Sequence, residues 1–380
     1  MSRRRSILAL ATYPESAAAT RFRITAMLPY LRAGGWDVRF EPFMDEAFLS
    51  GFYANGSGLK KATYLAARSF ERLALALGAA GMDAVFIQRE AALIGPPYVE
   101  FILRSLKRLP IIFDFDDAIW ELHLKSSTHP IAARALKDPN KCWFTMRRAA
   151  GVIAGSNYLA ERAREVNPNV TVVPTVVSSK AWTPWSGRLR GEFYGDGPTR
   201  IGWVGTHTTA HQLELVEPAL RQLRAEGYAF EVHVVGAGED FELGTVELRS
   251  RPWRLVDELQ EFRRIDIGLA PMHGGPVYQG KCAFKQIQYM SVGVPFVSSW
   301  VGGARDFVVE GENGLVAHTK EDWYRHLKAL LESYELRRKL SQNGRRLIER
   351  EYCVEVQGPR VAQFVEEALW RGKGRDHIRF

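Results

Sequence analysis

The sequence predicts an α/β protein of two doubly wound domains, each a parallel sheet covered by helices. Its 380 residues exceed what one ordinary hydrophobic core holds. Short strand-like runs alternate with helical patterns along the whole chain, and repeated strand–helix units place parallel strands in a sheet between helices. With 46% apolar and 25% charged residues, the chain has enough apolar side chains to fill such cores, which excludes an intrinsically disordered protein.

Six short runs in the first half are predicted strands, because each is rich in β-branched or aromatic residues and is bounded by turn residues. They are residues 7–11, 37–40, 84–87, 111–115, 151–154 and 170–173. Helical patterns lie between them, and residues 59–77 show the clearest, with apolar side chains three or four positions apart.

The second half repeats this alternation. Its predicted strands are 201–204, 230–235, 246–248, 265–269, 295–298 and 315–317, and its predicted helices are 213–226, 255–264 and 281–292. Residues 174–199 follow neither period and form the predicted linker. Ligands of open parallel sheets bind beyond the carboxyl ends of the strands, so two such domains that face each other predict one deep cleft.

Composition narrows the class of protein. Cys142, Cys282 and Cys353 lie far apart, which excludes a disulfide scaffold or a zinc-finger spacing and indicates a reducing compartment. The sequence has no run of about eighteen apolar residues, and the apolar run after the N-terminal arginines is too short for a secretory signal. We therefore expect a soluble, cytoplasmic protein.

All the excess positive charge lies in the first half. Residues 1–180 carry 24 Lys and Arg against 16 Asp and Glu, a net +8, whereas residues 181–380 carry 27 of each and are neutral. This asymmetry indicates an acidic partner for the first half, such as a phospholipid surface, a lipid phosphate or nucleic acid. The alternative is a solvated face that only keeps the protein soluble.

The most informative segment is 276–295, where a glycine-containing loop leads into the predicted helix 281–292. Lys281, Lys285 and Gln288 are four and three positions apart, so they share one helix face. A cation at a helix N-terminus is unfavourable unless an anion binds there, because the free N–H groups already attract negative charge. We expect a diphosphate at this place. The alternative is a solvent-facing lysine pair on an ordinary surface helix.

This segment resembles the donor-site stretch of GT-B glycosyltransferases of family 4. The residues that carry the resemblance occur in the family's order: 201–206, 235–238, 266–271, 280–299, 302–303 and 311–315. The resemblance covers the second domain, while the first half matches in its strand–helix layout. It implies the GT-B fold, in which two Rossmann-like domains face each other across a cleft.

The resemblance also implies how the chain is divided. In the family, the last helix crosses back to the first domain, and an apolar face formed by Val361, Phe364, Val365 and Leu369 agrees with this. We therefore expect an acceptor-binding domain over residues 1–180 plus 355–380, and a nucleotide-sugar donor-binding domain over 181–354.

Several donor-site residues follow from the resemblance, which implies retaining transfer of a sugar from a nucleotide diphosphate, usually without a metal. The family's donor helix carries two glutamates separated by seven residues; here the second falls on Gln288, whose amide still bonds a ribose, and the first on Gly280. No metal or other cofactor is expected.

The family's Arg and Lys after the first strand of this domain are also replaced. In this sequence Gly205, Thr206 and His207 stand near that place, and His207 is expected to donate to a phosphate oxygen. Lys281 and Lys285 would then supply the positive charge. The alternative for the nearby Thr208 is a plain helix cap.

Three carboxylates, Asp114, Asp116 and Asp117, mark the end of the predicted strand 111–115. A Mg²⁺ or Mn²⁺ site would need further oxygen ligands, and no other acidic cluster obviously supplies them. A His-Asp pair that positions the acceptor in the resembling family aligns with Asp116 and Asp117. We take these two and Lys281 as candidate catalytic residues; the alternative is a cap for a helix near 118–124.

Charged side chains at other strand ends of the first domain are candidate acceptor-binding residues. Arg89 and Glu90 follow the strand 84–87, and Arg21 and Arg23 follow the loop after the first strand. They are expected to touch an anionic acceptor, and surface ion pairs are the alternative.

The helix 59–77 has an apolar stripe, and Lys61, Tyr64, Arg68 and Arg72 lie on the opposite face. This pattern is typical of a helix on an anionic membrane surface, and equally of a helix that packs its apolar stripe on its own domain. Nucleic acid is not expected, because no recognisable binding motif accompanies the basic residues.

Together these observations predict a retaining glycosyltransferase of hexosyltransferase type. It would move a sugar from a nucleotide-diphosphate sugar to an anionic, lipid-linked or polysaccharide acceptor in cell-envelope glycan synthesis, such as that of lipopolysaccharide, in the cytoplasm or peripherally on the inner face of the membrane. Two alternatives stay open: a GT-B nucleotide-sugar epimerase, and a non-catalytic nucleotide-sugar-binding or membrane scaffold.

Overall fold

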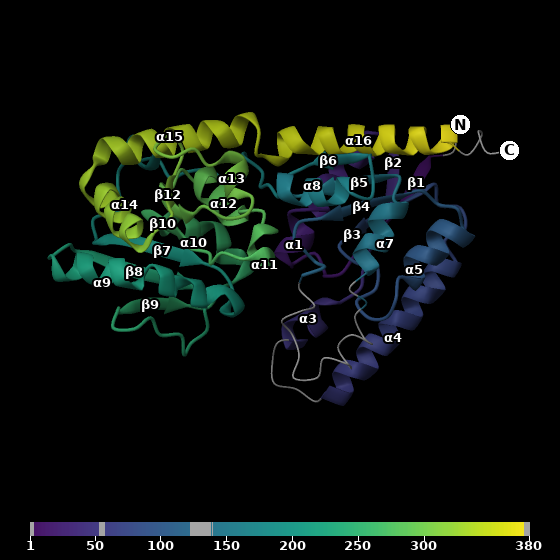
Figure 1. Cartoon of the computed structure of the whole chain (residues 1–380), viewed down its shortest axis with the longest axis horizontal. Coiled ribbons are helices and arrows are strands. Elements are labelled where there is room, and N and C mark those ends of the chain that lie inside the picture. Colours follow the sequence, from purple (N-terminus) through teal and green to yellow (C-terminus); the bar gives the residue numbers. More distant parts are fainter. Residues whose placement is uncertain (1–3, 53–57, 122–137, 139, 376–380) are drawn as a thin grey trace. The chain divides into compact units, whose positions relative to one another are not determined.

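The computed structural model describes residues 4–52, 58–121, 138 and 140–375, and it divides the chain into two compact units (Figure 1). The first unit comprises Met1–Thr175 and Gln357–Phe380, and the second comprises Val176–Val356. The chain therefore passes between the units twice, close to the predicted divisions after residue 180 and before residue 355. Among the described helices, none is both long and apolar enough to cross a membrane.

The first unit contains a six-stranded parallel sheet in the order β2-β1-β3-β4-β5-β6. Its strands are β1 (Arg5–Ala11), β2 (Trp36–Pro42), β3 (Ala84–Gln88), β4 (Ile111–Phe115), β5 (Gly151–Ala154) and β6 (Val170–Val172). All six coincide with predicted strands, because short β-branched runs between turn residues leave little ambiguity. The strand order turns back between β1 and β3, which places a topological switch point at their carboxyl ends.

The helices of the first unit cover this sheet. They are α1 (Ala18–Arg21), η1 (Thr25–Met27), α2 (Leu28–Ala33), α3 (Glu46–Phe52), α4 (Gly58–Leu77), α5 (Tyr98–Phe101), η2 (Ile102–Leu106), α7 (Lys141–Arg148), α8 (Asn157–Arg164) and most of α16 (Val354–Arg375). The helix predicted near 118–124 is a turn at residues 119–121, and residues 122–124 lie outside the described part.

The helix α16 packs its apolar face on the first unit. Val361, Val365 and Leu369 are buried. A Cβ atom on Gly151 of β5 would lie 2.9 Å from the side chains of both Phe364 and Ala368, so only glycine lets the helix approach the strand this closely. The last residues of the predicted C-terminal segment, 376–380, lie outside the described part.

The second unit has its own six-stranded parallel sheet, in the order β12-β11-β10-β7-β8-β9. Its strands are β7 (Thr199–Val204), β8 (Phe230–Val235), β9 (Leu248–Arg251), β10 (Ile267–Ala270), β11 (Phe296–Ser299) and β12 (Leu315–Ala317). The prediction of two doubly wound α/β sheets is confirmed. The strand predicted at 246–248 is wrong in its extent, since Val246 lies in an isolated bridge with Leu243 and β9 only begins at Leu248.

Helices also cover the sheet of the second unit. They are η4 (Arg188–Arg190), η5 (His207–Leu215), α9 (Glu217–Ala225), η6 (Leu255–Asp257), α10 (Glu258–Arg264), α11 (Pro276–Gln279), α12 (Phe284–Ser291), α13 (Ala304–Phe307), α14 (Lys320–Glu332) and α15 (Tyr334–Arg350). The predicted helix 213–226 is thus a 3₁₀ helix followed by α9, with Pro218 in the first turn of α9.

One side chain fixes α12 against the sheet. The hydroxyl of the buried Tyr289 donates to the carbonyl oxygens of Gly202 in β7 and Leu269 in β10, each at 3.0 Å. Gly268 lies under the Tyr289 ring, and a Cβ atom there would meet the ring at 2.8 Å. The missing side chain at Gly268 therefore lets α12 lie where β7 and β10 pair.

Substitution of Gly268 by Ala should lower the free energy of unfolding by about 1–3 kcal/mol, because the buried ring cannot move away without losing its hydrogen bonds. Thermal unfolding measures this as a lower midpoint. Gly274→Ala is the matched control, since a Cβ atom there meets nothing within 4 Å. Equal midpoints for the two variants would contradict the packing argument.

Candidate functional site

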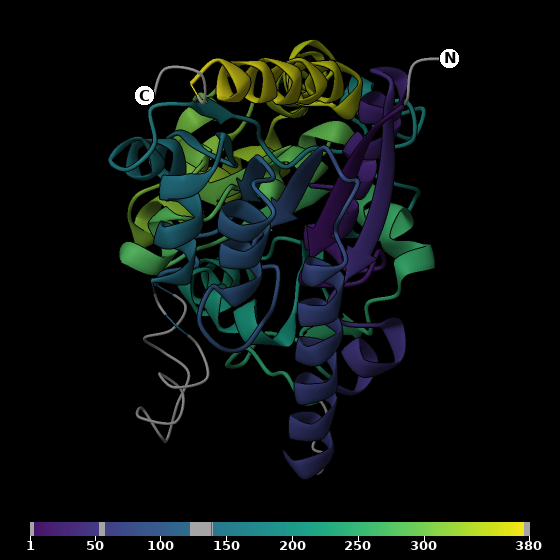
Figure 2. The same ribbon diagram turned by 90° about the vertical axis from the view of Figure 1, so that its right-hand side faces the viewer.

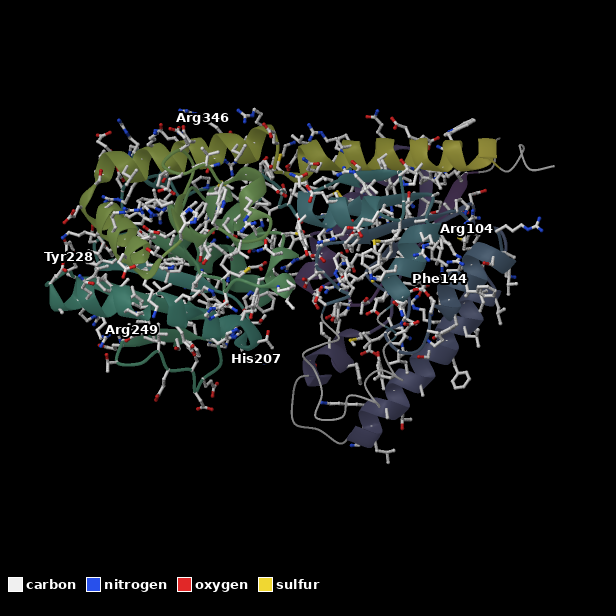
Figure 3. All side chains as sticks on the ribbon, in the orientation of Figure 1. Arg104, Phe144, His207, Tyr228, Arg249 and Arg346 are labelled. Atoms are coloured by element: carbon white, nitrogen blue, oxygen red, sulfur yellow. The ribbon has the colours of Figure 1, made fainter. Side chains whose placement is uncertain are left out.

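The loop after β7 begins the candidate site of the second unit. The Gly205 N–H donates to the Val235 carbonyl oxygen at 3.0 Å. A Cβ atom on Gly205 would lie 2.3 Å from the Trp203 ring and 3.0 Å from the Lys285 ammonium nitrogen, so glycine is required where this loop crosses the two side chains. Thr206 and His207, which follow, are exposed (Figure 3).

The residue that caps η5 is Thr206 and not Thr208. Thr206 precedes the first helical residue, and its N–H donates to the Thr209 hydroxyl at 3.4 Å. Thr208 lies within the first turn, and its hydroxyl is 2.8 Å from that of Thr206. These threonine hydroxyls therefore order the start of η5 and leave the His207 ring at the surface.

Lys285 projects from α12 to the carboxyl end of β7. Its ammonium group donates to the Val204 carbonyl oxygen and lies 4.1 Å from the centre of the Trp203 ring. Burial lowers the pKa of Lys285 to about 7, because a partly desolvated cation is less stable than the neutral amine. Lys285 is therefore neither a solvent-facing lysine nor permanently charged.

The N-terminus of α12 differs from its prediction. The helix begins at Phe284, three residues after Lys281, because Ala283 adopts a left-handed conformation with φ of 53°. Such a backbone is costly for alanine and marks a position under local constraint. The cap residue Ala283 has no side chain that could bond the helix. The positive partial charge at a helix N-terminus favours an anion.

Lys281 lies in the loop before α12, so it does not share a helix face with Lys285 and Gln288. This loop is held by two glycines after β11: the Gly303 N–H donates to the Lys281 carbonyl oxygen at 2.7 Å, and a Cβ atom on Gly302 would be 2.4 Å from that oxygen. Gln288 is buried. Gly280, just before Lys281, ends α11.

The segment after β9 adds three exposed side chains at this end of the sheet, and the sequence did not predict them as site residues. Trp253, Leu255 and Val256 are exposed large apolar side chains. A Cβ atom on Gly236, at the end of β8, would lie 3.1 Å from Trp253 Cβ, so Trp253 stands beside the glycine-containing loop after β8. These apolar residues are visible in the sequence, but the predicted strand ends at residue 248, three residues before the end of β9, and the predicted helix 255–264 includes Leu255 and Val256.

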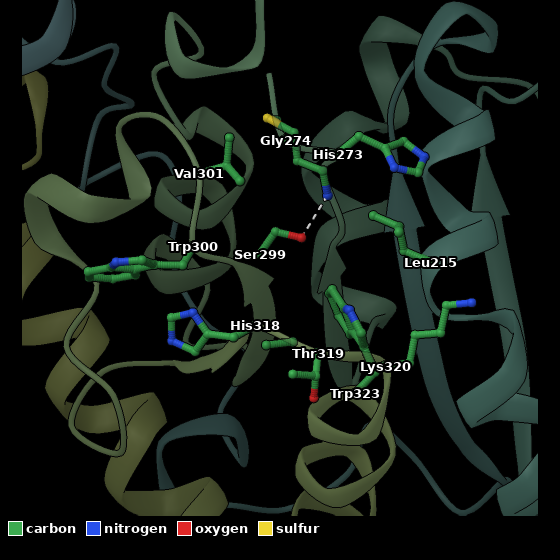
Figure 4. Close-up of a pocket in the computed structure, with 12 residues that line it drawn as sticks. Leu215, His273, Gly274, Ser299, Trp300, Val301, His318, Thr319, Lys320 and Trp323 are labelled. Atoms are coloured by element: carbon green, nitrogen blue, oxygen red, sulfur yellow. Dashed lines mark hydrogen bonds between the residues drawn. The ribbon is translucent and has the colours of Figure 1, made fainter. Parts of the chain in front are cut away.

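A separate pocket of about 410 Å³ lies at the carboxyl ends of β10, β11 and β12 (Figure 4). Its polar lining includes His273, Ser299, His318 and Lys320, beside the indole of Trp300. The Ser299 hydroxyl accepts a hydrogen bond from the Met272 N–H at 2.9 Å, which ties the walls together. None of the predicted donor-site residues lines this pocket.

The candidate site of the first unit centres on Arg89, at the carboxyl end of β3. Arg89 has a φ of 65°, which is strained for a residue with a side chain. Its guanidinium lies 3.8 Å from an Asp116 oxygen and 3.5 Å from an Asp117 oxygen, both just beyond β4. Burial alone would lower the pKa of Arg89, but these carboxylates raise it above its ordinary value.

Arg23 does not face a ligand. It is 2% exposed and forms a buried ion pair with Asp114, whose carboxylate accepts from two guanidinium nitrogens. Burial raises the pKa of Asp114 to about 6, although Arg23 opposes this shift. The expectation that Arg23 binds an acceptor is therefore corrected: it joins α1 and its following turn to β4. Arg21 lies over the Phe22 ring at 4.4 Å.

Glu90 is also paired within the unit. Its carboxylate is 3.6 Å from the ammonium nitrogen of the buried Lys141, which donates to the Ala92 carbonyl oxygen at 2.7 Å. The cations Arg23, Arg89 and Lys141 thus all have carboxylate partners. An anionic ligand at Arg89 would compete with two aspartates, whereas a ligand hydroxyl could donate to one of them.

The described residues contain no group of three or more His, Cys, Asp or Glu side chains placed to hold a metal ion. Asp116 and Asp117 instead pair with the Arg89 guanidinium.

Comparisons with known proteins agree with this architecture. Residues 198–333 match the family model described as "Glycosyl transferases group 1". No curated protein matches the sequence significantly. Among solved structures, HepE of Anabaena in complex with UDP and glucose is 14% identical over 96% of this chain and 100% of its own, with a TM-score of 0.65.

Two further structures are similar in fold. Sucrose-phosphate synthase of Thermosynechococcus elongatus is 14% identical, covers 96% of this chain and 99% of its own, and has a TM-score of 0.66. The lipopolysaccharide outer core galactosyltransferase WaaB is 16% identical with the same coverage and a TM-score of 0.57. These proteins share the GT-B fold, and at this identity the likeness establishes the fold alone.

The lowered pKa of Lys285 makes stability depend on pH in a defined direction. Below about pH 7 the folded state bears the full cost of a buried cation. Between pH 7 and the ordinary lysine pKa of 10.5 the folded state has lost the proton and the unfolded state keeps it, so relative stability rises with pH. Lys285→Met should therefore raise the unfolding midpoint at pH 6 and raise it less at pH 9. A gain independent of pH would show that Lys285 titrates normally.

Proposed function

We propose that this chain, a GT-B glycosyltransferase whose second unit carries a group 1 glycosyl transferase domain, moves a sugar from a nucleotide-diphosphate sugar with retention of configuration. The acceptor would be a lipid-linked or polysaccharide glycan of the cell envelope. The observation that carries the proposal is the arrangement at the end of β7, where Lys285 from α12 lies under the glycine loop and on the Trp203 ring.

The diphosphate suits this place on electrostatic grounds. The first N–H groups of α12 offer positive partial charge. An anion beside Lys285 favours its protonated form, so binding would restore the charge that burial removes. Lys281 in the preceding loop and His207 after β7 add two nearby polar groups of the same unit. Gly205 lets the loop after β7 pass over Trp203 and Lys285, because a Cβ atom there would meet both side chains.

The nucleoside would extend toward the ends of β8 and β9. The exposed Trp253 beside Gly236 offers an aromatic face to a base. Gln288 remains the candidate partner of the ribose. UDP is the first nucleotide to test, because it is bound in the similarly folded HepE.

Departure of the diphosphate would be the step that the second unit assists. The bond between the anomeric carbon and the phosphate oxygen breaks, and its electron pair stays on that oxygen. Negative charge then grows where helix N–H groups and lysine ammonium groups are already oriented, which lowers the barrier most. The acceptor hydroxyl attacks from the face that the leaving group vacates and passes its proton to the departing phosphate. No side-chain nucleophile and no metal take part in this scheme.

The first unit would bind the acceptor. Asp116 and Asp117 are suited to accept hydrogen bonds from acceptor or sugar hydroxyls, and Arg89 holds both carboxylates in place. Because Arg89 is already paired, contact with a glycan hydroxyl is favoured over contact with an anionic group at this point. Any anionic part of the acceptor would then meet the excess positive charge elsewhere on the first unit. A lipid-linked acceptor agrees with a peripheral position on the inner face of a membrane.

The donor assignment predicts a selective thermal shift. One of UDP, GDP, dTDP and CDP should raise the unfolding midpoint at pH 6.5, and EDTA should not change the shift. A nucleotide at a hundred times its dissociation constant stabilises by about 2.7 kcal/mol. Lys285→Ala should weaken binding at least tenfold. With a nucleotide sugar, whose diphosphate does not titrate near neutrality, wild-type affinity should fall as the pH rises above 7.

Lys320→Ala is the matched control, because this lysine also lies at the start of a helix of the second unit but belongs to the separate pocket. It should bind nucleotide as the wild type does. The reverse result, with Lys320 needed and Lys285 not, would move the nucleotide to that pocket. A flat response to all four nucleotides would favour the scaffold alternative.

Asp116→Asn should separate transfer from donor binding. We expect kcat/KM for transfer to fall at least tenfold while nucleotide affinity stays unchanged, because Asp116 belongs to the first unit and the donor residues to the second. The measurement compares initial rates of transfer with a thermal shift on the same preparation. Unchanged rates would remove Asp116 from the site, and sugar conversion without any acceptor would reveal an epimerase.

A further inference from the structure

The solvent face of α4 is apolar along its whole length. Leu59, Phe70 and Leu77 are 77%, 73% and 50% exposed. At 100° per residue they fall within 20° of one another around the helix axis, at the centre of the exposed arc. The other exposed residues on this arc are small or uncharged: Ala62, Thr63, Ala66, Ala67 and Ala74. The charged residues Lys60 and Glu71 lie at one edge of this exposed arc.

The polar face of α4 is the one that packs on the first unit, contrary to the usual arrangement. Arg72 is buried and donates to the Glu41 carbonyl oxygen at 2.6 Å. Arg68 donates to the Phe43 and Pro42 carbonyl oxygens at 2.7 and 2.8 Å. These bonds fix the rotation of α4 about its axis, so the apolar face cannot turn inward without breaking them.

Tyr64 reinforces the same orientation. Its ring stacks on Phe48 of α3 with centroids 3.6 Å apart, and its hydroxyl donates to the Asp45 carboxylate at 2.9 Å. Of the two alternatives for this helix, packing of the apolar stripe on its own domain is therefore wrong, because Leu59, Phe70 and Leu77 of the stripe face solvent. The first turns of α4 extend beyond the sheet of the first unit (Figure 2).

The segment next to α4, formed by α5 and η2, also exposes apolar side chains. α5 and η2 pack beside α4, where the Tyr98 hydroxyl donates to the Ser69 carbonyl oxygen at 3.2 Å. Phe101 and Leu106 on this element are 47% and 61% exposed. Basic residues accompany them: Arg104, Lys107 and Arg108. Exposed apolar side chains next to cations are typical of surfaces that enter the headgroup region of a bilayer.

We infer that the apolar face of α4, with Phe101 and Leu106, docks the protein on an anionic phospholipid bilayer. The +8 net charge of residues 1–180 supports this partner, because it attracts an anionic surface. The same charge would repel a second copy of the chain. Docking does not depend on the proposed reaction, but it names the surface through which a lipid-linked acceptor would be reached.

Vesicle sedimentation tests this inference with the full chain. We expect the protein to sediment with vesicles of phosphatidylcholine and phosphatidylglycerol, and less with phosphatidylcholine alone or in high salt. Leu59→Ser/Phe70→Ser/Leu77→Ser should reduce the bound fraction at least tenfold. Lys60→Glu/Arg108→Glu should weaken only the binding to anionic vesicles. The control is Val309→Ser/Tyr334→Ser, which removes two exposed apolar side chains of the second unit and should bind as the wild type does.

Thermal midpoints and nucleotide shifts of all variants are measured alongside, so that loss of folding is not mistaken for loss of docking. Failure of the wild type to sediment, or equal sedimentation of the triple-serine variant, would overturn the inference. A dimer that dissociates in the triple-serine variant would assign the face to a second copy and overturn it equally. Vesicle binding without any nucleotide shift would refute the proposed function and leave the docking surface standing.

Discussion

In the second unit, the position of α12 on the sheet depends on the side chain of Tyr289. Tyr289 joins α12 to two paired strands through hydrogen bonds to their carbonyl oxygens, and its ring rests on a glycine because a side chain there would push the helix away. With α12 fixed in this way, Lys285 on the same helix reaches the end of β7 and lies on the Trp203 ring. The glycine-requiring loop then crosses above both. The packing of Tyr289 and the position of Lys285, a candidate donor-site residue, thus depend on the same helix.

The first unit uses buried charge in a different way. Carboxylates at its strand ends are paired with Arg23, with Arg89 or with Lys141 of α7. Removal of one partner from such a pair leaves an uncompensated charge, which costs far more than the pair contributes. These ion pairs hold Asp116 and Asp117 in place, where we propose that they accept hydrogen bonds from hydroxyl groups of the acceptor. The unit's free positive charge lies elsewhere, on and around the helices that cover the sheet.

Much of the fold could be predicted from the sequence, because alternation of short β-branched runs with 3.6-residue periods is a strong signal. Local conformation was harder. No sequence pattern announces that Ala283 adopts a left-handed backbone, and this single residue moves the start of α12 beyond Lys281. The direction of Lys285 depends on the glycine at 205, which is distant in sequence. For α4 the amphipathic pattern was right, but carbonyl oxygens of the first unit that bind Arg68 and Arg72 decided which face turns inward.

The titration of Lys285 has a consequence for selectivity. Burial lowers the pKa of Lys285 from 10.5 to about 7, so near neutral pH this lysine carries less charge than an exposed one. Before an anion is in contact, Lys285 therefore adds less to the long-range field that attracts polyanions than an exposed lysine would. Its full charge develops only when a suitably shaped anion is already in contact. Such a site would attract anions more slowly but discriminate better among them. This is useful where free phosphate and nucleic acid are abundant competitors.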